Sequence, residues 1–186
     1  MIFGQGLLGV NEANAFILGC EETKEAWLID AGEYDPRFGR FLEKYGLRLT
    51  GILITHGHWD HTDGLAECVN AFHAEVYSNR DSMAGVASTR LGHGDSVRIG
   101  RIEGRIVETP GHTPDGISLI VPGMVFTGDA LFNGSVGGTD GQAEFDRQIA
   151  AIREHIFTLP EDTQVHVGHG PSTTVGIEKQ FNPFFV

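Results

Sequence analysis

The sequence has little of what marks a secreted, disulfide-bonded or membrane protein. Only two of its 186 residues are cysteines, Cys20 and Cys68, and neither lies in a metal-ligand motif, so we expect two reduced thiols. No apolar run approaches the roughly 20 residues of a membrane span. The N-terminus lacks the basic region of a secretory signal. These absences predict a cytoplasmic protein that does not contact a membrane.

Basic residues are also few. The chain has 13 Lys and Arg against 25 Asp and Glu, which gives a formal net charge of −12. A nucleic-acid partner requires clustered cations that neutralise phosphates, so this balance argues against one. The length suits one well-cored domain and is short for two, so we expect a single domain over residues 1–186. The oligomeric state is left open.

Histidine is concentrated in one segment. Residues 55–61 read Thr-His-Gly-His-Trp-Asp-His and follow an apolar, strand-like run at Leu49–Ile54. Three imidazoles and a carboxylate in so short a stretch serve no packing purpose, but they suit a divalent transition metal. Three further candidate ligands follow in order, each near a glycine-containing turn beside an apolar run: His112, Asp129 and His169. The pattern predicts a metalloenzyme.

Short apolar runs and helical periodicity divide the rest of the chain. Strands are predicted at Ala13–Leu18, Ala26–Ile29, Leu49–Ile54, Val97–Ile99, Ile106–Thr109, Ile117–Val121, Val125–Thr127 and Val165–Val167. Helices are predicted at Pro36–Tyr45, from Asp63 to about Ala71, from about Ala143 to Phe157, and around Thr174–Lys179. Asp63 is the expected N-cap of the second helix. Strands lead each half and helices follow, which favours two packed sheets with helices outside.

The order and spacing of the ligand motifs resemble the metallo-β-lactamase superfamily over nearly the entire chain. Within it, the runs at 126–137 and 168–184 resemble small bacterial glyoxalase II-like (hydroxyacylglutathione hydrolase-like) proteins. The resemblance implies an α/β fold, an αββα sandwich of two mixed sheets with helices outside. It also implies a pair of metal sites in a groove between the sheets. The chain ends too soon after His169 for the C-terminal glutathione-binding helical domain of longer glyoxalases, so no such domain is expected.

The resemblance assigns a role to each ligand. The first metal would be held by His56, His58 and His112, the second by Asp60, His61 and His169, and Asp129 would bridge both. Two divalent ions are expected, zinc first, with iron or manganese as alternatives. The catalytic carboxylates would be Asp60 and Asp129, with Asp60 acting as a base where only the first site is filled.

This metal pair implies a metallo-hydrolase that acts on thioester bonds. Metal-bound hydroxide would attack the carbonyl carbon of a small-molecule thioester such as S-D-lactoylglutathione, and the thiolate leaves without strong acid assistance. Two alternatives remain open. In an iron-dependent glutathione persulfide dioxygenase, a single iron would be held by His56, His112 and Asp129; a lactonase or esterase would use the full pair. The acyl and thiol parts of the substrate and the native metal are not specified.

Two positions depart from relatives. The chain has Gly138 where glyoxalase II-like proteins tend to have arginine, which puts a loop support or a carboxylate anchor in doubt. It has Asp129 where zinc β-lactamases typically have cysteine, which argues against β-lactam hydrolysis. Four other histidines lie outside the ligand motifs and are expected to be surface or packed residues: His73, His93, His155 and His166.

Overall fold

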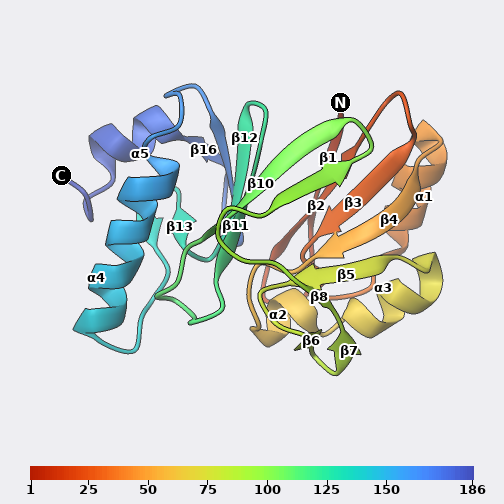
Figure 1. Cartoon of the computed structure of the whole chain (residues 1–186), viewed down its shortest axis with the longest axis horizontal. Coiled ribbons are helices and arrows are strands. Elements are labelled where there is room, and N and C mark those ends of the chain that lie inside the picture. Colours follow the sequence, from red (N-terminus) through yellow and green to blue (C-terminus); the bar gives the residue numbers. More distant parts are fainter.

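The structure, a computed structural model that describes residues 1–186, consists of two six-stranded sheets packed face to face (Figure 1). The first sheet has the order β1-β2-β3-β4-β5-β8 and the second the order β16-β15-β12-β11-β10-β9. The strands of the first are β1 (Ile2–Leu7), β2 (Asn14–Gly19), β3 (Glu25–Ile29), β4 (Arg48–Leu53), β5 (Glu75–Ser78) and β8 (Thr89–Arg90). Those of the second are β9 (Ser96–Ile99), β10 (Ile102–Glu108), β11 (Ile117–Val121), β12 (Met124–Gly128), β15 (Gln164–Val167) and β16 (Thr173–Thr174).

Helices cover the outer face of each sheet (Figure 1). They are α1 (Pro36–Tyr45), α3 (Leu65–Phe72), α4 (Gln142–Ala151) and α5 (Val175–Phe181), and a short helix α2 (Trp59–Thr62) precedes α3. One turn of π-helix, η1 (Ile152–Ile156), continues α4, and two small hairpins complete the chain: β6 (Ser82–Met83) with β7 (Val86–Ala87), and β13 (Leu131–Phe132) with β14 (Ser135–Val136). Both sheets are mixed, since β3, β4 and β5 run parallel, as do β12 and β15, beside antiparallel neighbours.

The molecule has four layers, two sheets between two layers of helices. An apolar cluster fills each of the three contacts between neighbouring layers. Side chains alternate along the strands, so β2 sends Phe16 and Leu18 into the space between the sheets while Ile17 packs under α1 and α3. A third cluster, which includes Ile152 and Ile156, joins the second sheet to α4 and η1. The αββα sandwich expected from the sequence is therefore confirmed.

Helix α1 shows how local sequence determines an element. Asp35 caps it by accepting a hydrogen bond from the backbone N–H of Arg37 at 2.7 Å, and Pro36 occupies the first turn. Gly46 ends the helix in the left-handed conformation, with φ of 64°. The bounds match the prediction because the signals at both ends are local.

Some predictions about individual helices and strands were wrong. Asp63 does not cap α3: its backbone N–H donates to the carbonyl of Trp59, so it ends the short helix α2, and Gly64 precedes α3. The end of the ligand motif, from Trp59 to His61, lies in α2, a helix that was not predicted. Strand β1 was not predicted because Gly4 and Gly6 interrupt its apolar pattern.

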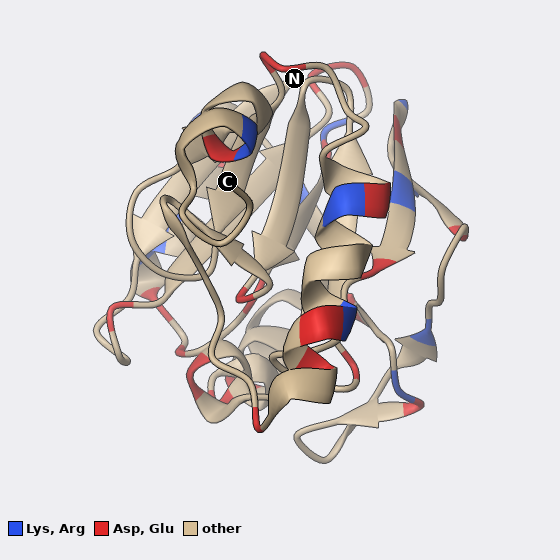
Figure 2. Ribbon diagram, turned by 90° about the vertical axis from the view of Figure 1, so that its left-hand side faces the viewer, with Lys and Arg blue, Asp and Glu red and all other residues tan.

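The formal charge of −12 is not gathered on one helix. Acidic segments lie on helices and in loops, with Lys and Arg segments interspersed among them (Figure 2). None of the helices combines the length and apolar character needed to cross a bilayer. Both cysteines are buried and unpaired, as expected.

Gly64 allows the segment after the ligand motif to approach the loop that follows β3. A Cβ atom at this position would lie 2.2 Å from the backbone carbon of Glu33, whereas one at Gly39 in α1 would meet nothing within 4 Å. We expect Gly64→Ala to lower the free energy of unfolding by about 1–3 kcal/mol. Gly39→Ala, the matched control, should raise it by about 0.5–1 kcal/mol. Urea denaturation measures both, and equal effects of the two substitutions would contradict the close contact.

Candidate metal centre

Four predicted ligands from three loops form one group. The ligand atoms of His56, His58, His112 and Asp129 all lie within 4.8 Å of one another. The loop after β4 supplies His56 and His58, the loop after β10 supplies His112, and the end of β12 supplies Asp129. Nε2 of His112 lies 2.9 Å from Nδ1 of His58 and 3.4 Å from Oδ2 of Asp129. These are the predicted residues of the first site together with the predicted bridge.

The other three predicted ligands, Asp60, His61 and His169, form a second group under the same distance limit. Helix α2 carries Asp60 and His61, and the loop between β15 and β16 carries His169. Nε2 of His169 lies 3.3 Å from Nε2 of His61 and 3.3 Å from Oδ2 of Asp60.

The carboxylate of Asp129 stands between the two groups. Its Oδ2 lies 3.4 Å from Nε2 of His112 and 3.5 Å from Nε2 of His169, while its Oδ1 lies 3.4 Å from Nε2 of His61. Gly168 makes room for this carboxylate, because a Cβ atom there would lie 2.0 Å from Oδ1 of Asp129. One carboxylate therefore faces both groups, which is the arrangement of a bridging ligand.

A second buried carboxylate, Asp30, orients two of the histidines. Nδ1–H of His61 donates to Oδ2 of Asp30 at 2.9 Å, and the hydroxyl of Thr55 donates to the same oxygen at 2.9 Å. Because that hydroxyl donates to Asp30, it accepts at 3.1 Å from Nδ1–H of His56. Both rings consequently present Nε2 to the cluster, and such outer hydrogen bonds are typical of metal-ligating histidines.

The backbone of Gly138 orients a third ring. Its carbonyl accepts from Nδ1–H of His112 at 2.7 Å, which leaves Nε2 of His112 as the ligand atom. A Cβ atom at Gly138 would meet nothing within 4 Å, so space does not require glycine there. The position contributes through its carbonyl, whichever side chain it carries.

This arrangement fits a pair of divalent metal ions. The Nε2 atom of His56 and the Oδ1 atom of Asp129 are buried and make no hydrogen bond, although such groups are costly to leave unpaired. Ring nitrogens also converge within each group: those of His58 and His112 lie 2.9 Å apart, and those of His61 and His169 lie 3.3 Å apart. Imidazole and carboxylate donors suit zinc, iron or manganese, and they do not distinguish among these metals.

Burial and charge set the protonation of the buried ligands. Burial, with the charge of His61 as the second cause, lowers the pKa of His56 to about 4, so its ring is neutral at pH 7. Burial opposes the charged form of His61, but Asp30 and Asp129 outweigh it and raise its pKa to about 10. Burial likewise disfavours ionised Asp129, yet contact with His61 holds its pKa at about 2. His61 would therefore have to give up a proton to serve as a metal ligand at the second group.

Sequence reasoning missed several residues that support the ligands. Asp30 directly follows the predicted strand Ala26–Ile29, and a carboxylate at a strand end was the available signal. Asn11 donates to Oδ2 of Asp60 at 2.6 Å, and Asn14 donates to the carbonyls of Val167 and Gly170 on either side of His169. Neither asparagine lies in a recognisable pattern. The histidines expected outside the site, including buried His166, are not part of either group.

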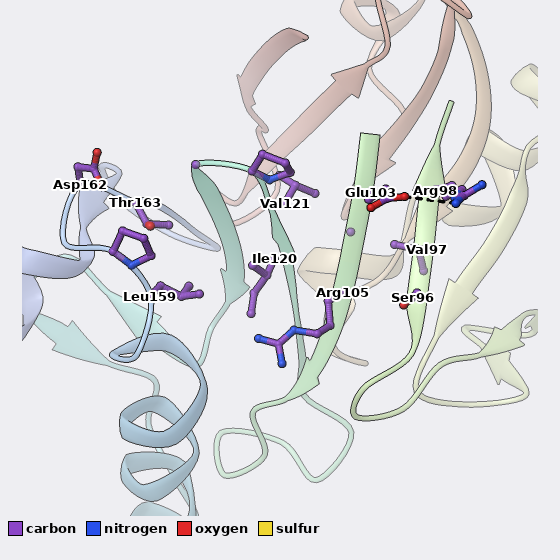
Figure 3. Close-up of a pocket in the computed structure, with 14 residues that line it drawn as sticks. Ser96, Val97, Arg98, Glu103, Arg105, Ile120, Val121, Leu159, Asp162 and Thr163 are labelled. Carbon is purple, nitrogen blue, oxygen red and sulfur yellow. Dashed lines mark hydrogen bonds and ion pairs between the residues drawn. The ribbon is translucent and has the colours of Figure 1, made fainter. Parts of the chain in front are cut away.

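A groove of about 550 Å³ opens onto the two groups. Its lining consists of five of the seven ligands with three other residues: His58, Asp60, His112, Asp129 and His169, with Asn11, Trp59 and Phe132. A larger hollow, of about 630 Å³, lies elsewhere (Figure 3). Strands β9, β10 and β11 form one wall of it and residues 159–163 the other, and it contains none of the ligands.

Sequence comparison identifies a family and several relatives. The family model of the metallo-beta-lactamase superfamily matches residues 8–169. A probable metallo-hydrolase of Streptococcus pyogenes is 34% identical over an alignment of 185 residues. The match covers 85% of this chain and 80% of that protein. A hydroxyacylglutathione hydrolase of Pseudoalteromonas translucida is 36% identical over 154 residues, 82% of this chain. The match covers 58% of that longer relative.

Solved structures agree with this result. The BLEG-1 B3 metallo-beta-lactamase is 31% identical with a TM-score of 0.89, and the match covers 100% of both chains. ETHE1 from Myxococcus xanthus is 33% identical with a TM-score of 0.85, covering 98% of this chain and 84% of that one. TTHA1623 in a di-iron-bound form is 30% identical with a TM-score of 0.81, covering 97% of this chain and 99% of that one.

The hydrogen bonds of Asp30 predict that its charge supports metal binding. We expect Asp30→Asn to weaken binding of divalent metal by about 10–100-fold, because His61 loses its charged acceptor and the Thr55–His56 chain is disturbed. Asp146→Asn, on the exposed side of α4, makes the same charge change away from the site and should have no effect. Competition with a chromophoric chelator measures both affinities. Unchanged affinity in Asp30→Asn would show that Asp30 does not orient ligands.

Proposed function

Because the chain belongs to the metallo-β-lactamase superfamily and is a metallo-hydrolase of that superfamily, we propose that it hydrolyses thioesters of the hydroxyacylglutathione type. The observation that carries this proposal is the position of Asp129 between two ligand groups that open onto one groove. Two divalent ions held there would polarise a carbonyl group and lower the pKa of a water molecule to roughly 7. We propose His56, His58 and His112 as ligands of one ion, Asp60, His61 and His169 of the other, and Asp129 of both.

The ligands have different exposure, and this determines where a substrate enters. His56 and His61 are buried, whereas His58, His112 and His169 are partly exposed and line the groove. The thioester carbonyl therefore approaches from the groove side, where the histidine ligands present their accessible edges. The buried ligands and Asp30 hold the opposite side rigid, which keeps the site preorganised.

Asp60 is placed to take part in proton movement. It lines the groove, and Asn11 and the charge of His61 outweigh burial and hold its pKa below the usual range. It is therefore an ionised acceptor at neutral pH. In the hydrolysis, water adds to the acyl carbon, the carbon–sulfur bond breaks, and the proton from water passes to the thiolate. A thiol with a pKa of about 8.5 leaves readily, so no strong general acid is required.

The decisive experiment measures turnover of S-D-lactoylglutathione together with metal content. We expect two metal equivalents per chain and a loss of more than about 100-fold in kcat/KM for His58→Ala, which removes a ligand from the groove side. His93→Ala is the matched control, since His93 is exposed and outside both groups. A His58→Ala variant as active as the wild type would contradict the proposed site. Faster turnover of nitrocefin than of the thioester would instead favour the β-lactamase activity suggested by the resemblance to BLEG-1.

A second candidate function, oxidation of a glutathione persulfide at a single iron, has some support from the similarity to ETHE1. It would use His56, His112 and Asp129, which lie in the first group. The close approach of His58 to His112, at 2.9 Å, and the completeness of the second group favour a metal pair. One iron per chain, oxygen uptake with glutathione persulfide and no thioester turnover would decide for this candidate. A lactonase or esterase reaction would show as faster turnover of an oxygen ester.

A further inference from the structure

Two apolar side chains, Trp59 and Phe132, line the groove above the candidate metal centre. Trp59, at the start of α2, is 56% exposed, although it lies inside the ligand motif. Phe132, in the β13–β14 hairpin, is partly buried, and its ring stands edge-on to His169 at 6.2 Å between centroids. The other six lining residues are the five ligands and Asn11, so only Trp59 and Phe132 offer apolar surface to a bound molecule. Exposed aromatic side chains beside a polar centre are typical of ligand contacts.

No cationic side chain lines this groove, although cations line other hollows of the same protein. Arg98 and Arg105 line the large hollow on β9 and β10 (Figure 3). Arg80 and Arg90 line a polar hollow of about 340 Å³. Carboxylate groups of ligands are usually bound by guanidinium or ammonium groups. The free carboxylates of glutathione have no such partner among the side chains that line the groove.

From these two observations we propose that the preferred substrate is a thioester whose thiol part carries no net charge. Trp59 and Phe132 contact its apolar portion while the carbonyl lies at the candidate metal centre. This inference rests on the proposed thioester hydrolysis and deepens it, because it names the class of thiol. Trp59 and Phe132 are then specificity-determining residues, whereas a glutathione thioester is a poorer substrate of the same site.

The fluorescence of Trp59 can report the binding of a ligand in the groove. It has two tryptophans, and the second, Trp27, is only 4% exposed and stacks on Tyr77 with a centroid distance of 4.5 Å. Solvent-exposed fluorescence therefore arises from Trp59. A ligand that covers Trp59 shifts this emission to shorter wavelength, and the signal does not depend on turnover.

The test compares two thioether analogues that cannot be hydrolysed, on the metal-loaded protein. S-hexyl-N-acetylcysteamine is uncharged, whereas S-hexylglutathione carries two carboxylates and an ammonium group. At roughly 0.15 M salt we expect the uncharged analogue to bind at least about tenfold more tightly and to shift the Trp59 emission. Equal or tighter binding of S-hexylglutathione would overturn the proposal. If Arg90→Ala then weakened that binding, the polar hollow at Arg90 would be identified as the anion site.

Variants test the two apolar side chains separately by calorimetry, which does not need the tryptophan signal. Trp59→Ala should weaken binding of the uncharged analogue by about tenfold, and Trp59→Phe should restore most of it. Phe132→Leu keeps an apolar residue in the partly buried position, so the fold is retained, and it should weaken binding less. Phe181→Ala removes an aromatic side chain that is 66% exposed and outside the groove, and it should change nothing. Unaltered affinity in Trp59→Ala would overturn the role assigned to Trp59.

Kinetics separate failure of this inference from failure of the proposed function. The lactoyl thioesters of N-acetylcysteamine and of glutathione share the acyl group and differ in the thiol. Turnover of both with a higher kcat/KM for the uncharged ester supports the inference. A higher kcat/KM for the glutathione ester overturns the inference and leaves thioester hydrolysis standing. If the protein hydrolyses neither ester, the proposed function is wrong, and the inference is wrong with it.

Discussion

The buried carboxylate of Asp30 connects the candidate metal centre to the first sheet. It follows β3 in the left-handed conformation, with φ of 59°, which is uncommon for a residue other than glycine. It accepts hydrogen bonds from the backbone N–H and the hydroxyl of Thr55 and from the ring of His61. A buried carboxylate with three donors is stable only where those donors are held in place. The same contacts therefore stabilise the end of β3, the loop after β4 and the orientation of the ligands.

The ligands are divided between the two halves of the sandwich. The loop after β4 and helix α2 carry four of them, whereas the loops after β10, β12 and β15 of the second sheet carry the other three. The shared core around Phe16, Leu119 and Phe126 fixes the distance between the sheets. Each ligand group contains residues from both halves, so the packing of the sheets determines the geometry of both groups. Stability of the core and geometry of the centre are consequently linked.

Different residues of the groove are placed for the reaction and for the choice of substrate. The ligands and their hydrogen-bond partners are almost wholly polar, which suits the metallo-hydrolase class to which the chain belongs. Trp59 and Phe132 add the apolar surface beside the ligands, and no arginine is among the residues that line the groove. A superfamily with one centre acts on different substrates when such side chains differ.

The sequence by itself determined the family, the sandwich and the order of the seven candidate ligands, because these depend on local motifs and on the alternation of apolar residues. The range of α1 followed from the helical spacing of its apolar residues, and the structure shows Asp35 and Gly46 as its caps. Tertiary structure alone decided that Asp30 and the carbonyl of Gly138 orient the rings, and that Trp59 lines a groove without cationic side chains. These features depend on contacts between residues far apart in the chain, such as Asp30 with His61 and His112 with Gly138. Such contacts have no local signature, because they join loops that only the folded chain brings together.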